Sequence, residues 1–168
     1  MEHKKTPPAV IAGRIIFTLC LAATVIFIFG NSAQAANVSS EASGRVLLFL
    51  QKLVTKLGHP GLASRITMHR VRKLAHFCEY MLEGFWLMLC VRVYTRHFVT
   101  HISWPILGIL LTAVIDETIQ MFSSGRSSQI TDVWIDFAGG MTGLLCGLLV
   151  LCIVRMCVIL YRHRNDEE

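Results

Sequence analysis

Residues 116–143 read DETIQMFSSGRSSQITDVWIDFAGGMTG, and this stretch joins the end of one long apolar segment to the start of the next. It holds four of the eleven acidic residues of the chain. A carboxylate in or beside hydrocarbon is costly, and when present it usually faces a bundle interior or a cavity with a partner. The stretch therefore predicts both the meeting point of two helices and the place where functional side chains gather.

The composition around this stretch predicts an integral membrane protein. The chain has 168 residues, of which 54% are hydrophobic and only 16% are charged. A soluble domain of this size cannot bury so much apolar surface, whereas a bilayer accepts it without a core. We expect a single domain covering residues 1–168, with the lipid bilayer as its main partner and no nucleic-acid partner.

Four apolar segments approach the roughly 17 to 25 residues that a membrane-spanning helix needs. They cover approximately residues 10–30, 74–92, 102–121 and 132–154. The first is followed by Ala33-Gln34-Ala35, which also matches the cleavage pattern of a secretory signal. The spanning interpretation uses the whole segment and needs no processing, so we predict four spans, with cleavage as the alternative.

Between the first and second spans, residues 31–43 read as a polar loop and residues 44–57 as an amphipathic helix. In the second stretch Val46, Leu50 and Leu53 recur at helical spacing, while Lys52 and Lys56 fall on the opposite face. Such a helix is expected to lie along the membrane surface. The alternative is a helix packed on the bundle with its cations in water. The predicted fold is thus an all-α membrane protein with four transmembrane helices and an amphipathic interfacial helix between helices one and two.

Basic residues predict the orientation of the spans, because Lys and Arg near segment ends favour the cytoplasmic side. Such residues precede the first span, follow the second and follow the fourth, at Lys4, Lys5, Arg14, Arg92, Arg96, Arg155, Arg162 and Arg164. Both termini are therefore expected in the cytoplasm. This places the start of helix two, the end of helix three and the start of helix four at the outer leaflet.

One cationic cluster contradicts this bias, because the first external loop carries several Lys and Arg residues, from Arg45 to Lys73. These cations either pair with the nearby carboxylates or contact an anionic headgroup. Pairing within the chain is the purely structural interpretation, since buried charges normally neutralise one another.

The candidate binding residues follow from helical spacing. In the second span His76, Glu79, Tyr80 and Glu83 lie at i, i+3, i+4 and i+7, hence on one helix face. On the third segment Asp116, Glu117 and Gln120 share helical spacing, and on the fourth Asp136 follows Asp132 at i+4 on the same face. The full predicted binding set is Arg72, Lys73, His76, Glu79, Tyr80, Glu83, Glu117, Gln120, Arg126, Asp132 and Asp136.

The fourth span also contains Gly139, Gly143 and Gly147, which form two overlapping G-x-x-x-G patterns. Such patterns allow two helix backbones to approach closely. The close packing could lie within the chain or between two copies, so a homo-oligomer through the glycine face is one possibility.

The residue types of this set are compatible with more than one kind of function. His76, Glu79 and Glu117 are candidates for general acid–base catalysis, since burial can tune a carboxyl group for proton transfer. Only one histidine is well placed and no His-Glu-x-x-His pattern occurs, so we predict no metal and no cofactor. The polar stripe ends at Glu83, which favours a one-sided outer pocket over a proton conduit. An internal polar network that merely joins the helices is the remaining interpretation.

Three blocks with ordered spacing resemble the VanZ-like family of small membrane proteins. They are Arg72-Lys73-x-x-His76-Phe77-x-Glu79-Tyr80, Glu117-x-x-Gln120-x-Phe122-x-x-Gly125-Arg126 and Asp132-Val-x-x-Asp136-x-x-Gly139-x-x-x-Gly143. The resemblance covers roughly residues 70–150. It departs from the family pattern at Ser124, where Pro is common, at Gln129, where an acidic residue often stands, and at Asp136, where Asn is usual.

The resemblance implies a multi-pass protein of the bacterial plasma membrane, in a family linked to teicoplanin-type glycopeptide resistance. We therefore predict a polar pocket at the outer leaflet that binds or remodels the headgroup of an anionic lipid or lipid-linked envelope precursor. Arg72, Lys73 and Arg126 would be the cation contacts. The alternative is an intramembrane enzyme that acts on such a lipid with its Glu and His residues.

Overall fold

The computed structural model describes residues 7–95, 99–125 and 129–166, except for the side chains of residues 36–39, 42 and 99. The described chain is helical, without strands: α1 (Pro8–Ser32), α2 (Ala36–Lys56), α3 (Pro60–Ala63), α4 (Met68–Tyr94), the 3-10 helix η1 (Val99–His101), α5 (Ser103–Phe122) and α6 (Ile130–Asp166). Helices α1, α4, α5 and α6 are long and apolar enough to cross a membrane. The predicted all-α fold with four candidate spans, and a further helix between the first two, is confirmed.

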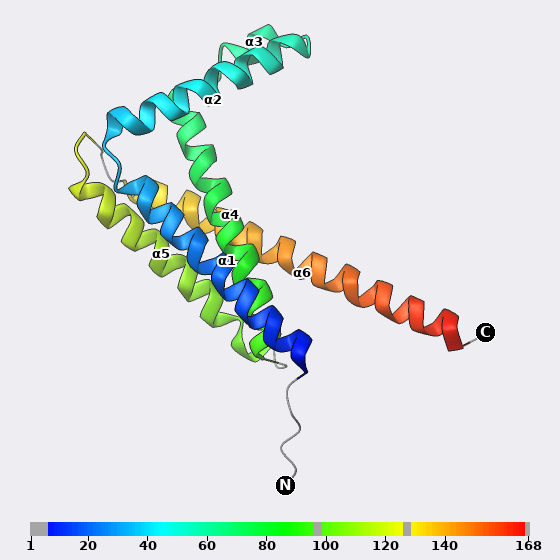
Figure 1. The fold of residues 1–168 in the computed structure, drawn as a ribbon. Helices are drawn as coiled ribbons and strands as arrows, with labels where there is room; N and C mark the ends of the chain where they lie inside the picture. The colour runs from blue at the N-terminus through cyan, green and yellow to red at the C-terminus, as the bar shows by residue number, and fades with distance from the viewer. Residues whose placement is uncertain (1–6, 96–98, 126–128, 167–168) are drawn as a thin grey trace.

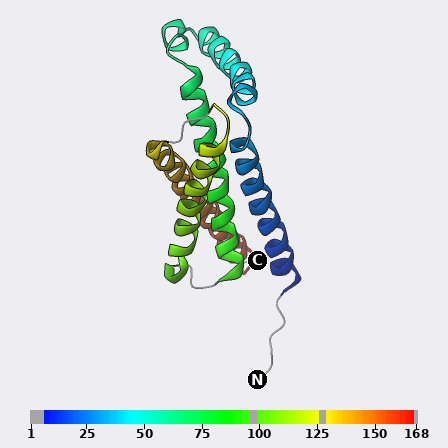
Figure 2. The same cartoon turned by 90° about the vertical axis from the view of Figure 1, so that its left-hand side faces the viewer.

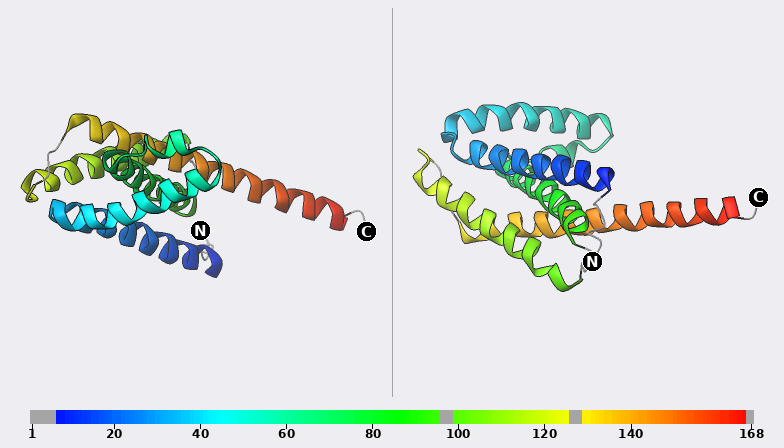
Figure 3. Two further views of the ribbon diagram at one scale, coloured as in Figure 1. Left: turned by 90° about the horizontal axis from the view of Figure 1, so that it is seen from above. Right: turned by 60° about the horizontal axis from the view of Figure 1, so that its bottom comes forward.

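The four long helices alternate in direction, and α4 is the central one (Figure 1). It contacts α1 on one side and α6 on another, and it also touches α5. Seen from the side in Figure 2, α1, α4 and α5 lie next to one another, while α2 continues beyond the end of α1. The two views of Figure 3 show α6 crossing the other helices and projecting beyond them towards the C-terminus.

Two helix starts differ from the prediction. Residues 36–43, which we expected as a loop, form the first turns of α2. A polar composition does not stop a helix when, as here, it contains no proline or glycine. Helix α4 begins at Met68 rather than near residue 74, because the Thr67 side chain caps it by accepting a hydrogen bond from the Arg70 backbone N–H at 3.4 Å. The apolar boundary marks the expected membrane edge, not the end of the helix.

The end of the last helix also differs. We expected the fourth span to end near residue 154, but α6 continues to Asp166. No glycine or proline follows Gly147, so nothing in the sequence interrupts the helix. With 37 residues, α6 reaches about 55 Å at a rise of 1.5 Å per residue, well beyond the hydrocarbon thickness of a bilayer.

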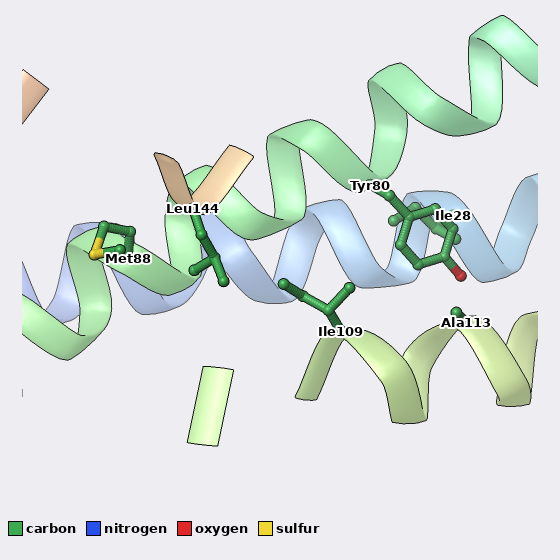
Figure 4. Packing of buried hydrophobic residues seen from close by; sticks show 6 residues of the cluster. All are labelled: Ile28, Tyr80, Met88, Ile109, Ala113 and Leu144. Atoms are coloured by element: carbon green, nitrogen blue, oxygen red, sulfur yellow. The ribbon is translucent and has the colours of Figure 1, made fainter. Parts of the chain in front are cut away.

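A small buried core lies where the four long helices meet. It consists of Ile28 of α1, Tyr80 and Met88 of α4, Ile109 and Ala113 of α5, and Leu144 of α6 (Figure 4). Each of these side chains is at most 3% exposed. Many large apolar side chains on the outer surfaces of the same helices are exposed, as a lipid-facing surface requires.

Glycines bring α4 and α6 into backbone contact. A Cβ atom on Gly139 would collide with the Phe77 carbonyl, and one on Gly143 would collide with the Met81 carbonyl. Gly147 lies against the side chain of Met88 of α4. The predicted glycine face of residues 139, 143 and 147 is therefore covered by α4 of the same chain. A homo-oligomer, which remains a prediction, would have to use another surface.

Polar contacts hold α1 against α4 at both ends. Near its start, Arg14 Nε donates to the Val93 carbonyl at 3.0 Å, and its guanidinium lies over the Tyr94 ring. At its far end, Asn31 Nδ2 donates to Glu79 Oε1 at 2.9 Å. The second contact belongs to the end of the bundle where the predicted site residues gather.

Candidate functional site

The predicted polar residues gather at one end of the bundle, which we call the polar end. It comprises the last residues of α1, the first half of α4, the last half of α5 and the first two turns of α6. The topology brings these segments together because α1 and α5 end where α4 and α6 begin (Figure 1). Several of its charged or amide side chains are almost fully buried, namely Glu83, Asp116, Glu117, Gln120 and Asp136.

The polar end contains a small cavity, the polar cavity, with a volume of about 100 Å³. Its walls come from α4, α5, α6 and the connection between the last two. The lining residues are His69, Arg72, Lys73, His76, Glu117, Gln120, Gly125, Gln129, Asp132, Ile135 and Asp136. Apart from Gly125 and Ile135, all of them carry charged, imidazole or amide side chains.

A larger and mainly apolar space, the apolar groove, adjoins the polar cavity. Its volume is about 550 Å³, and it runs between α1, α2 and α4. The lining residues are Phe27, Asn31, Gln34, Ser43, Val46, Leu50, Val71, Arg72, Leu74, Ala75, His76, Cys78 and Glu79. Arg72 and His76 line both spaces, so these two side chains form the boundary between a polar and an apolar compartment.

The two cations of the polar cavity differ in their pairing. Lys73 Nζ lies 2.7 Å from Asp132 Oδ1, which neutralises both groups. Within the described part of the chain, Arg72 forms no ion pair. Arg72 therefore presents a positive charge to both compartments, and a guanidinium is well suited to bind an anionic oxygen pair.

Three side chains from three helices approach one another beside the polar cavity, and two of them, His76 and Asp136, line it. His76 Nδ1 of α4 lies 3.8 Å from Asp116 Oδ2 of α5 and 4.0 Å from Asp136 Oδ1 of α6. Asp116 is fully buried and Asp136 is 1% exposed. Gln120 Nε2 donates to Asp116 Oδ2 at 2.9 Å and thereby orients that carboxylate. Neither oxygen of Asp136 has a hydrogen-bond partner among the described residues.

Other carboxylates of the polar end serve to join helices. Glu83 Oε1 accepts from Thr112 Oγ1 of α5 at 2.8 Å, and Glu117 Oε2 accepts from the Gln129 backbone N–H at 3.1 Å. With the Asn31–Glu79 bond, these contacts link α1, α4, α5 and the start of α6. Part of the predicted set thus forms an internal polar network that joins the helices, since each of these bonds satisfies a polar group away from water.

The comparisons with known proteins identify the family. The family model described as VanZ/LLP1 matches residues 15–155. The chain belongs to the VanZ/LLP1 family. The match confirms the predicted VanZ-like resemblance and includes every residue that lines the polar cavity and the apolar groove. No match was found among curated proteins or among solved structures.

The predicted binding residues of this VanZ/LLP1 protein separate into four groups. Those that line the polar cavity are Arg72, Lys73, His76, Glu117, Gln120, Asp132 and Asp136. Glu79 lines the apolar groove. Tyr80 and Glu83 are buried in the helix packing and line neither space. Arg126 lies outside the described residues.

The sequence-based selection missed Asp116, His69 and Gln129. The spacing of Asp116 four residues before Gln120 places both on one helix face, but the predicted binding set did not include Asp116. His69 lies two turns before His76 on α4, in the basic segment ahead of the second apolar segment, and the predicted binding set did not include it. Gln129 enters the VanZ/LLP1 site partly through its backbone N–H, for which sequence offers no signal.

Proposed function

We propose that this VanZ/LLP1 protein binds the headgroup of an anionic lipid or lipid-linked envelope precursor at the outer leaflet of the bacterial plasma membrane. The observation that carries the proposal is the junction of the polar cavity with the apolar groove at Arg72 and His76. An amphiphile has the same two parts, a charged head joined to an apolar tail. A polar cavity alone or an apolar groove alone would fit many ligands, but two such spaces side by side favour an amphiphile.

The sizes of the two spaces fit this division. A polar cavity of about 100 Å³ can hold several water molecules or a phosphate-sized group, and it is too small for a lipid. The apolar groove is several times larger and can receive the first part of an acyl or prenyl chain. Arg72 would bind the phosphate with its guanidinium, because paired N–H groups match two anionic oxygens.

The proposed side of the membrane follows from the basic residues near the other ends of the helices. Both termini would lie in the cytoplasm, and the polar end would face outwards. In this position the site would meet lipid headgroups and envelope precursors of the outer leaflet. The teicoplanin-type resistance associated with VanZ-like proteins is compatible with a protein that binds or remodels such headgroups.

Arg72→Gln tests the cation contact. We expect the affinity for phosphatidylglycerol and for undecaprenyl phosphate to fall by about ten-fold or more, because a hydrogen bond to a charged group contributes about 1.5–3 kcal/mol. Titration of each lipid into delipidated protein, followed by native mass spectrometry, measures the effect. Arg45→Gln is the matched control: Arg45 is an exposed arginine of α2 and lines neither space. Equal binding by all three proteins contradicts the proposal.

The enzymatic alternative rests on the position of His76, which lies beside two buried carboxylates and borders both compartments. Its neighbours could take or return a proton at the headgroup. The same mass spectra distinguish the two functions. A bound lipid that is recovered with unchanged mass supports binding, whereas time-dependent conversion to a product of different mass supports catalysis.

Thiol labelling at Ser124 tests the proposed orientation. In a Ser124→Cys variant whose six native cysteines are replaced by serine or alanine, a membrane-impermeant maleimide should label intact cells. Ser124 is exposed and follows α5 at the polar end, so the reagent can reach it from that side. A cysteine placed at Arg162 should react only after the membrane is permeabilised. The reverse pattern would place the polar end in the cytoplasm and exclude the outer leaflet.

A further inference from the structure

His76, Asp116 and Asp136 form a cluster whose geometry is not explained by their contacts with one another. Their ligand atoms lie within 4.8 Å of one another, and the two His–Asp separations are 3.8 and 4.0 Å. A direct N–H···O hydrogen bond spans about 2.7–3.2 Å, so the imidazole and the two carboxylates do not bond each other directly. The ligand atoms of the three side chains therefore lie close together without direct hydrogen bonds between them.

From this arrangement we propose that His76, Asp116 and Asp136 bind a divalent transition-metal ion of the Zn²⁺ or Mn²⁺ type. Atoms held about 2.1 Å from a single ion lie roughly 3.0–4.2 Å apart, depending on the angle between them. Both His–Asp separations fall in this interval. The ligand oxygens of Asp116 and Asp136 lie within 4.8 Å of each other, so a side-chain shift of less than about 1 Å would bring them into the same interval.

The state of Asp136 is the second, independent observation. Its side chain is 1% exposed and lines the polar cavity, and neither of its oxygens has a hydrogen-bond partner in the described parts of the chain. A buried carboxylate that accepts no hydrogen bond is costly, and coordination to a cation is one of the few ways to compensate this cost. Asp116 lies close to it and carries the same charge, which strengthens the demand for a cation between them.

The surroundings hold the three ligands in place. Gln120 donates to Asp116 Oδ2, as hydrogen bonds outside a metal's coordination sphere usually do for ligating carboxylates. The contact of Gly139 with the Phe77 carbonyl, one turn after Asp136 and next to His76, brings α6 against α4 at this level. The site is therefore built from three helices whose spacing is set by packing.

The donor set indicates the class of metal. One imidazole nitrogen with two carboxylate oxygens suits zinc, manganese or iron, whereas Mg²⁺ and Ca²⁺ prefer oxygen ligands alone. Three protein ligands leave at least one coordination position for water or another ligand. That position would face the polar cavity, which His76 and Asp136 both line. The metal site does not depend on the proposed headgroup binding.

Metal titration of the purified protein tests the inference. After chelation and gel filtration, the full-length protein should bind a single Zn²⁺ or Mn²⁺ per chain, measured by calorimetry and by elemental analysis. Loss of a group outside the coordination sphere lowers metal affinity by up to about 100-fold. Because Asp136 would be a ligand itself, Asp136→Asn should lower the affinity by at least that factor. Asp166→Asn makes the same change at the C-terminal end of α6, at an exposed residue that lines neither the polar cavity nor the apolar groove, and should bind like the wild type.

Folding of each variant is checked by circular dichroism and gel filtration, and Asp136→Asn should fold because it replaces a buried carboxyl group that accepts no hydrogen bond in the described residues. Wild-type protein that binds neither Zn²⁺ nor Mn²⁺ overturns the inference, as does equal loss of binding in both variants. Equal affinity for Mg²⁺ or Ca²⁺ overturns the choice of metal class. Loss of lipid binding in Arg72→Gln with metal binding intact separates this inference from the proposed function.

Discussion

Replacing Gly143 with alanine is expected to destabilise the folded protein by about 3 kcal/mol or more, the upper end of the usual effect of overpacking. The new Cβ atom would collide with the Met81 carbonyl of α4, and backbone atoms cannot move away by a rotamer change. Helices α4 and α6 would have to separate, which also displaces Asp136 and His76. Thermal unfolding in detergent should show a midpoint lower by roughly 6–12 °C.

Gly30→Ala is the matched control for this prediction. Gly30 lies in α1, and a Cβ atom there would meet nothing within 4 Å. Alanine also has a higher helix propensity than glycine, so this variant should be at least as stable as the wild type. Equal destabilisation of both variants would show that detergent-solubilised protein does not retain the α4–α6 contact.

A double-mutant cycle between Gly140 and Ile109 is expected to show strong coupling. A Cβ atom on Gly140 would collide with the Ile109 side chain, and Ile109 is fully buried. Gly140→Ala alone should cost about 1–3 kcal/mol by overpacking, and Ile109→Ala alone about 2–5 kcal/mol by leaving a cavity. Combined, the new methyl group occupies part of the space that isoleucine vacates, so the double variant should be about 1–2 kcal/mol more stable than the sum predicts.

The control for this cycle pairs Ile109→Ala with Gly30→Ala, two sites without a shared contact in the structure. Their effects should add to within about 0.3–0.5 kcal/mol. Unfolding free energies of the six proteins, measured under one set of conditions, give both coupling energies. Additivity in the Gly140 cycle would mean that α5 and α6 do not pack as described.

The apolar segments predicted the helices, but the helix ends were less accurate. A hydropathy window detects where a chain can contact lipid, whereas a helix ends only where capping, proline or glycine ends it. Thr67 therefore starts α4 before the apolar segment begins, and α6 continues through its arginines to Asp166. The short helix α3 was not predicted, because four residues carry no periodic signal.

The candidate site was predictable as a set of residue types and much less so as a set of contacts. Helical spacing correctly placed His76 near Glu79 on α4, and it placed Asp116 on the helix face of Gln120. It could not separate Glu83, which bonds Thr112 inside the bundle, from Asp132, which pairs with Lys73 at the cavity. That distinction depends on depth along the bundle, and depth is set by how the helices cross.

The sequence by itself determined the fold class, the number of candidate spans and the end of the bundle at which polar residues gather, because these follow from hydropathy and periodicity along one chain. Only the tertiary structure decided that the glycines of α6 pack on α4, that Arg72 and His76 join two cavities, and that Asp116 and Asp136 approach one imidazole. These contacts join residues far apart in the chain, and they depend on side-chain packing between helices, which has no local signal in the sequence.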